Sequence, residues 1–123
     1  DHVSGLATMT KKYNVPVYAS MNTWDAMYCR DLIPTECCKV LPSSLGIGQV
    51  KVEPFSISHD AADPVGFRFY NGNNKCSVVT DLGFVTETVK EAIAFSDILI
   101  LESNHDVDML QNGAYPFKTS YFE

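Results

Sequence analysis

Apolar residues near the start of the chain recur at a helical interval. In "SGLATMTKKY" they are Leu6, Met9 and Tyr13, and Ser4 is placed to cap the first turn of a helix. Pro16 ends this pattern, because proline cannot continue a helix. The stretch "VPVYAS" that contains it then predicts a short buried strand.

A second helical stretch, "NTWDAMYCRDL", predicts a helix with Asn22 or Thr23 as its N-cap. Residues 30–46, "RDLIPTECCKVLPSSLG", contain two prolines and show no clear period. We expect this segment to be a loop that covers a site or docks on another part of the protein.

From Gln49 onward the period changes from helical to alternating. "QVKVEPFSIS" predicts a strand with a kink at Pro54. "GFRFYNGNNKCSVVTD" predicts a hairpin, because Phe67 and Phe69 alternate with polar residues and "NGNN" is a turn sequence.

The last third of the chain predicts two helices and one strand. "TETVKEAIAFS" reads as an amphipathic helix that begins after Thr86 and buries Val89, Ala92 and Ile93. "DILILES" is apolar throughout, which is typical of a strand covered on both faces. "DVDMLQNG" predicts a short helix ending before Gly113. The mixture of hairpins and crossovers indicates an α/β fold, a mixed sheet with helices packed outside.

Composition restricts the possible functions only slightly. With 46% hydrophobic and 20% charged residues, the chain has the composition of a folded domain rather than a disordered segment. A net charge of -6 provides no positive field to attract nucleic acid, although a bound metal can supply one locally. The four cysteines do not follow a zinc-knuckle spacing, and we expect reduced thiols in a cytoplasmic protein without a membrane span.

Residues that can bind metal occur in four short clusters. They are Asp1 with His2; His59 and Asp60 with Asp63; Asp81; and Glu102, Asn104, His105 and Asp106. If strand ends share one edge of a sheet, these clusters meet, and their imidazoles and carboxylates suit zinc, manganese or iron. Each cluster also has a purely structural interpretation, since such residues often order turns or cap helices. Spacing alone leaves both interpretations open.

Four stretches resemble motifs of the metallo-β-lactamase-fold hydrolases. "DHVSGL" is similar to the second half of the signature His-x-His-x-Asp-His-x-x-Gly. "ISHDAADPVGF", "VVTDLGFVT" and "LESNHDVDML" followed by "GAYP" resemble the branch typified by WalJ (YycJ), a metal-dependent, exonuclease-like group. The resemblance covers nearly the whole chain in order. It implies an αββα sandwich, of which residues 1–123 would form a single partial domain.

The resemblance implies a site with two divalent ions, zinc or manganese, with iron as a further possibility. Asp1 and His2 correspond to the last two signature ligands, which bind the second metal in the family. His59 corresponds to a ligand of the first metal, and Asp81 to the carboxylate that bridges both. Asp1 and Asp81 would therefore take part directly in catalysis.

Four further residues would stand beside the metal ligands. Glu102, Asn104 and His105 correspond to a family motif next to the site, where they would support the ligands or contact substrate. Asp60 could act in the same way. Gly66 fits a close approach of the backbone behind the strand that leads to His59.

Some motifs of the family do not occur in the chain. The first two signature histidines would precede Asp1, and the motifs Gly-His-Leu-Ser-Asn and His-Leu-Ser would follow Glu123. We therefore expect an internal fragment that lacks the N-terminal strands and the C-terminal part of its domain. Residues 1–123 alone should bind metal weakly and have no appreciable turnover.

The leading functional hypothesis is hydrolysis of phosphodiester bonds in DNA by a metal-activated hydroxide, as in a 5′-directed exonuclease. Candidate phosphate contacts are Lys11, Lys12, Arg30 and Lys39. Two alternatives stay open: a hydrolase of small esters, lactones or phosphodiesters, and a truncated, non-catalytic interaction domain. The fold hosts many reactions and cannot decide among them. The oligomeric state is not predicted.

Overall fold

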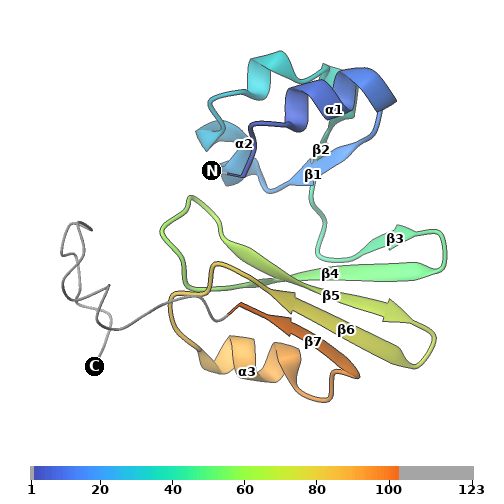
Figure 1. Cartoon of the computed structure of the whole chain (residues 1–123), viewed down its shortest axis with the longest axis vertical. Helices are drawn as coiled ribbons and strands as arrows, with labels where there is room; N and C mark the ends of the chain where they lie inside the picture. Colours follow the sequence, from blue (N-terminus) through green and yellow to red (C-terminus); the bar gives the residue numbers. More distant parts are fainter. Residues whose placement is uncertain (1, 103–123) are drawn as a thin grey trace.

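Two β-sheets organise residues 2–102, the part of the chain that a computed structural model describes (Figure 1). The first sheet and its helices comprise α1 (Leu6–Tyr13), β1 (Val17–Ala19), α2 (Met21–Ala26), 3-10 turns at Arg30–Leu32 and Thr35–Cys37, and β2 (Cys38–Val40). The second comprises β3 (Leu45–Ile47), β4 (Val50–Ser56), β5 (Val65–Asn71), β6 (Asn74–Val79), α3 (Glu87–Ile93) and β7 (Ile98–Leu101). The predicted α/β class is confirmed.

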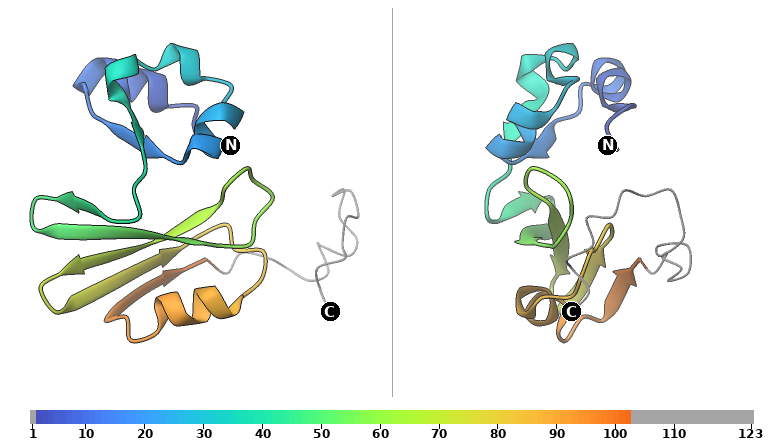
Figure 2. Two further views of the ribbon diagram at one scale, coloured as in Figure 1. Left: turned by 180° about the vertical axis from the view of Figure 1, so that it is seen from behind. Right: turned by 90° about the vertical axis from the view of Figure 1, so that its left-hand side faces the viewer.

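The larger sheet has the strand order β3-β4-β5-β6-β7. Its neighbours pair antiparallel, except β6 and β7, which pair parallel across the α3 crossover. The two views in Figure 2 show α3 against one face of this sheet and the smaller β1-β2 unit beyond its β3-β4 side. Within residues 2–102 no helix is long and apolar enough to cross a membrane.

The hairpin and the helix predicted in the second half of the chain are confirmed. Asn71 pairs with Asn74 around a two-residue loop, in which Gly72 has a φ of 58° that glycine adopts without strain. In α3, Thr86 Oγ1 accepts the Val89 amide at 3.2 Å. Val89 and Ala92 then pack on the sheet in a core with Phe55, Val79 and their apolar neighbours. Helical and alternating periods therefore identified these elements correctly.

Both helices of the first half differ from their predicted limits. Ser4 does not cap α1; Gly5 holds that position without a side-chain hydrogen bond. The N-cap of α2 is Ser20, two or three residues earlier than predicted, because Ser20 Oγ accepts the Thr23 amide at 3.2 Å. The helix ends at Ala26, since Met27 is extended, and Arg30–Leu32 forms a separate turn.

Residues 30–46 were predicted to be a loop, but they contain regular structure. It contains β2, which pairs parallel with β1, and most of β3, which pairs with β4. Trp24 stabilises this arrangement, because its indole donates to the Lys39 carbonyl at 2.9 Å and its ring packs with Ile33 and Cys37. Strands of three residues are too short to show a period of two, which explains why the pattern missed them.

β7 departs from the expectation of burial on both faces. Among the described residues its side chains are 43–60% exposed, and β7 is an edge strand. An apolar sequence makes a strand suitable for burial, but β7 is buried only where other elements pack against it. The predicted helix at 106–112 lies outside the described residues.

The turn between α3 and β7 holds an unusual phenylalanine. Phe95 is 100% exposed and has a φ of 57°, a conformation that disfavours residues with a Cβ. Hydrogen bonds on both sides fix the turn: Lys75 Nζ donates to the Ala94 carbonyl at 2.6 Å, and the Ser77 and Ser96 hydroxyls lie 2.8 Å apart. Desolvation, followed by the charge of Arg68, lowers the pKa of Lys75 in this position.

Phe95→Gly should therefore stabilise the fold. The left-handed conformation costs about 1–2 kcal/mol for a residue with a Cβ, and glycine loses about 0.5–1 kcal/mol more entropy on folding, so the free energy of unfolding should rise by about 0.5–1 kcal/mol. Urea denaturation measures this change. Tyr28→Gly is the control, since Tyr28 is exposed without a positive φ and its replacement should give no gain. Equal effects of the two substitutions would refute the strain at Phe95.

Candidate metal centre

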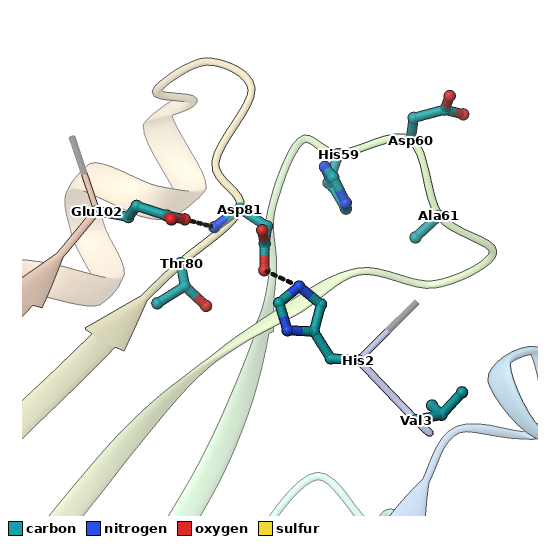
Figure 3. Close-up of a pocket in the computed structure, with 8 residues that line it drawn as sticks. All are labelled: His2, Val3, His59, Asp60, Ala61, Thr80, Asp81 and Glu102. Atoms are coloured by element: carbon teal, nitrogen blue, oxygen red, sulfur yellow. Dashed lines mark hydrogen bonds and ion pairs between the residues drawn. The ribbon is translucent and has the colours of Figure 1, made fainter. Parts of the chain in front are cut away.

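A pocket of about 860 Å³ opens where the N-terminal segment meets the ends of β4, β6 and β7 (Figure 3). Eight residues line it: His2, Val3, His59, Asp60, Ala61, Thr80, Asp81 and Glu102. The sequence had singled out five of these as site residues. The structure brings those five together, although they lie as far apart in the chain as His2 and Glu102.

The loops that follow β4 and β6 form one wall of this pocket and are hydrogen-bonded to each other. β4 ends at Ser56 and leads into the loop with His59, while β6 ends at Val79 and leads to Asp81. The Gly83 amide donates to the Ser58 carbonyl at 2.6 Å and fastens one loop to the other. This contact joins the loop that carries His59 to the loop that carries Asp81, and both residues line the pocket.

Gly83 is required by the closeness of that contact. A Cβ on Gly83 would lie 3.0 Å from the Ser58 carbonyl oxygen and 3.2 Å from its hydroxyl. Gly66 makes a similar close approach, since its Cβ would lie 2.6 Å from the Phe55 ring, which agrees with the tight packing expected there. Neither Ser58 nor Gly83 was predicted as part of the site, although "DLG" after a strand was the available signal.

Asp81 adopts a left-handed backbone conformation with a φ of 54°. Its amide donates to Glu102 Oε2 at 2.5 Å, and its own Oδ2 lies 3.8 Å from His2 Nε2. A left-handed residue costs about 1–2 kcal/mol, whereas a hydrogen bond to a charged group contributes about 1.5–3 kcal/mol. The bond to Glu102 is thus strong enough to hold the conformation.

The side chains of His2, His59 and Asp81 face a common space, whereas Asp60 is directed away from it (Figure 3). His2 is largely exposed and Asp81 is partly exposed, so water can reach this space. Asp60 lines the pocket without turning toward the other three. Asp1, Asn104 and His105 lie outside the described residues.

Imidazole nitrogens and carboxylate oxygens are the donors that zinc, manganese and iron accept. The residue types at the pocket therefore fit a divalent metal. Within residues 2–102, however, no three His, Cys, Asp or Glu side chains are placed to hold one ion. The metal-binding role of His2, His59 and Asp81 stays a prediction.

Comparison with known proteins gives clear relatives, although no family model matches the chain. "Exodeoxyribonuclease YycJ" of Bacillus anthracis is 41% identical over 122 residues, which cover 95% of this chain and 46% of that protein. This chain is therefore similar in sequence to that protein over nearly all of its own length. "Exodeoxyribonuclease WalJ" of Streptococcus pneumoniae serotype 2 is 29% identical over 123 residues, again 46% of its length. This chain thus spans about half the length of the curated relatives it matches.

A solved structure agrees on the fold. Zn(2+)-bound PqqB from Methylobacterium extorquens superposes with a TM-score of 0.69 over 94% of this chain and 47% of that chain. At 22% identity this likeness concerns the fold alone. PqqB has the metallo-β-lactamase fold, and this chain shares that fold over the part it matches. The sequence resemblance to this fold is confirmed.

Gly83→Ala should separate the two loops that form one wall of the pocket. The added methyl group meets the Ser58 backbone, and overpacking of this kind costs about 1–3 kcal/mol, which thermal unfolding would measure. Gly46→Ala is the matched control, because a Cβ there meets nothing within 4 Å and the φ is not positive. If both alanines have the same effect, the contact between Gly83 and Ser58 does not hold the loops together.

Proposed function

We propose that this chain forms part of a metal-dependent exodeoxyribonuclease whose metal centre includes His2, His59 and Asp81. The observation that carries the proposal is the 41% identity to Exodeoxyribonuclease YycJ across 95% of the chain. The pocket adds independent support, since it gathers metal-binding side chains from three distant segments. PqqB, which shares the fold, was crystallised with zinc.

The charges that line the pocket explain why such an enzyme would need metal. Asp60, Asp81 and Glu102 line it together with two histidines, and no lysine or arginine is among its lining residues within 2–102. A DNA phosphate would therefore meet carboxylates rather than cations. Divalent ions, zinc or manganese in our proposal, would supply the positive charge that draws in the phosphate and activates a water molecule.

The chain's own side chains would position these ions. His2 and His59 would contribute imidazole nitrogens from opposite sides, and the Asp81 carboxylate between them could contact two ions, with Asp1 beside His2 completing this part of the ligand set. The Ser58–Gly83 contact joins the loops that carry His59 and Asp81, and the ligand side chains would turn toward a bound ion from these fixed loops.

Basic residues outside the pocket are candidate contacts to the DNA backbone. Of the four basic residues considered above, Arg30 is engaged by Asp25 at 2.9 Å, and Lys12 lies 5.0 Å from the centre of the Tyr13 ring. Lys11 and Lys39 are exposed. We keep these four residues as candidate phosphate contacts. Removing the charge of one that contacts phosphate would weaken the salt dependence of DNA binding.

We further propose that the chain supplies one part of a larger metallo-β-lactamase-fold domain in a cytoplasmic protein. The chain matches 46% of the length of its relatives, which supports a contribution to the site from elsewhere in the whole protein. The four cysteines are free thiols, the state typical of a reducing compartment.

His59→Ala and Asp81→Ala should reduce exonuclease activity of the whole protein by more than about 100-fold, beyond the loss usual for residues that only support a ligand. The substrate is a 5′-phosphorylated, 3′-labelled oligonucleotide, assayed with manganese, with zinc and with a chelator. Asp31→Asn, an exposed carboxylate outside the pocket, should stay within about twofold of the unaltered protein.

Each alternative function predicts a different result. Cleavage of bis(p-nitrophenyl) phosphate or a lactone without cleavage of DNA would replace the nuclease with a small-molecule hydrolase. If no metal raises the melting temperature and no substrate is cleaved, the non-catalytic interaction domain is correct and the proposed enzyme is wrong.

A further inference from the structure

We propose that Glu102 is a positioning residue: its carboxylate holds the backbone of Asp81 in the left-handed conformation that turns the Asp81 side chain into the pocket. The proposal assigns Glu102 a contact with the Asp81 main chain in place of a contact with metal or substrate. It rests on the proposed function in one respect, which is that Asp81 serves as a metal ligand.

Asp81 needs an external partner to keep its conformation. β6 is extended up to Val79, and the chain must reverse direction within a few residues so that Gly83 can reach Ser58. The positive φ of 54° at Asp81 makes this reversal. Aspartate enters the left-handed region more readily than most residues, but an extended or helical backbone still competes with it. In those conformations the carboxylate would leave the side of the pocket where His2 lies.

The register of the sheet delivers Glu102 to the required place. Val79 pairs with Leu101 at the end of the parallel β6-β7 ladder, and the Glu102 amide adds one more bond by donating to the Val79 carbonyl at 3.0 Å. The Glu102 backbone is therefore fixed beside the turn. Its Oε2 then accepts the Asp81 amide at 2.5 Å, which places a charged acceptor on the N–H just beyond the strand end.

The directions of the side chains agree with this role. Figure 3 shows Glu102 reaching the Asp81 nitrogen from one side, while His2 meets the Asp81 carboxylate on the other. Glu102 and the two histidines thus lie on opposite sides of Asp81. A carboxylate that accepts the Asp81 backbone amide in this way acts on the site through Asp81.

The geometry predicts different behaviour for two substitutions in the whole protein. Glu102→Ala removes the acceptor, so zinc affinity, measured by competition with a chromophoric chelator, should fall about 10- to 100-fold. Glu102→Gln keeps an amide oxygen that can accept the Asp81 N–H, and affinity should return to within about threefold of the unaltered protein. Glu91→Ala, an exposed glutamate on α3, is the matched control and should bind zinc unchanged.

A second measurement reads the backbone directly and needs no metal. The amide chemical shift and the φ-dependent scalar couplings of Asp81, recorded by NMR without metal, should report a left-handed, hydrogen-bonded residue in the unaltered protein and in Glu102→Gln. In Glu102→Ala the amide shift and the couplings of Asp81 should no longer indicate a left-handed, hydrogen-bonded residue. The chemical shifts of α3 should stay unchanged, which separates this role from general unfolding.

The outcomes distinguish this proposal from the proposed function. If Glu102→Gln binds zinc as weakly as Glu102→Ala, or if Glu102→Ala retains the left-handed signals of Asp81, the positioning role is refuted. If the unaltered protein binds no zinc or manganese but the NMR signals change as expected, the positioning role is supported and the metal-dependent function fails.

Discussion

The parallel pairing of β6 with β7 is the constraint on which the site depends. It aligns the ends of two strands that are joined through α3, so that Asp81 and Glu102 emerge side by side. The antiparallel pairing of β4 and β5 places the loop with His59 at the same end of the sheet as Asp81 and Glu102. A slip of one residue in β6-β7 would move every side chain of β7 to the opposite face and remove the acceptor for the Asp81 amide.

Packing makes that register strongly specified on one face of the sheet. Val79 and Val89 are fully buried between β6 and α3, and Ser77 bonds to Ser96 beneath the same helix. The pocket differs from this core, because Asp60, Asp81 and Glu102 line it in exposed or partly exposed positions. A rigid scaffold that presents such groups is a common way to hold a cation, because the fold supplies the energy that keeps like charges together.

The sequence was most informative where local physics alone determines the structure. The turn at Gly72, the cap at Thr86 and the buried face of α3 follow from short-range chemistry, and each was predicted correctly. The site clusters were found because His59 and Asp81 follow strand-like runs and match family motifs.

What could not be predicted depends on partners distant in the chain. β2 forms because β1 lies beside it, and the exposure of β7 is set by which elements cover it. The contact between Gly83 and Ser58, and the conformation of Asp81 with Glu102 behind it, join residues whose relation only the folded sheet creates. Spacing shows which residues have suitable chemistry, but not which atom each one contacts.

We propose that His2, His59 and Asp81 bind divalent metal. The most direct test is a crystal structure of the whole protein with manganese or zinc, using anomalous scattering at the metal absorption edge to locate the ions. We expect an anomalous peak about 2.0–2.2 Å from a nitrogen of His59 or His2 and from a carboxylate oxygen of Asp81. A fully occupied metal site elsewhere in the protein, with these three side chains making no metal contact, would contradict it.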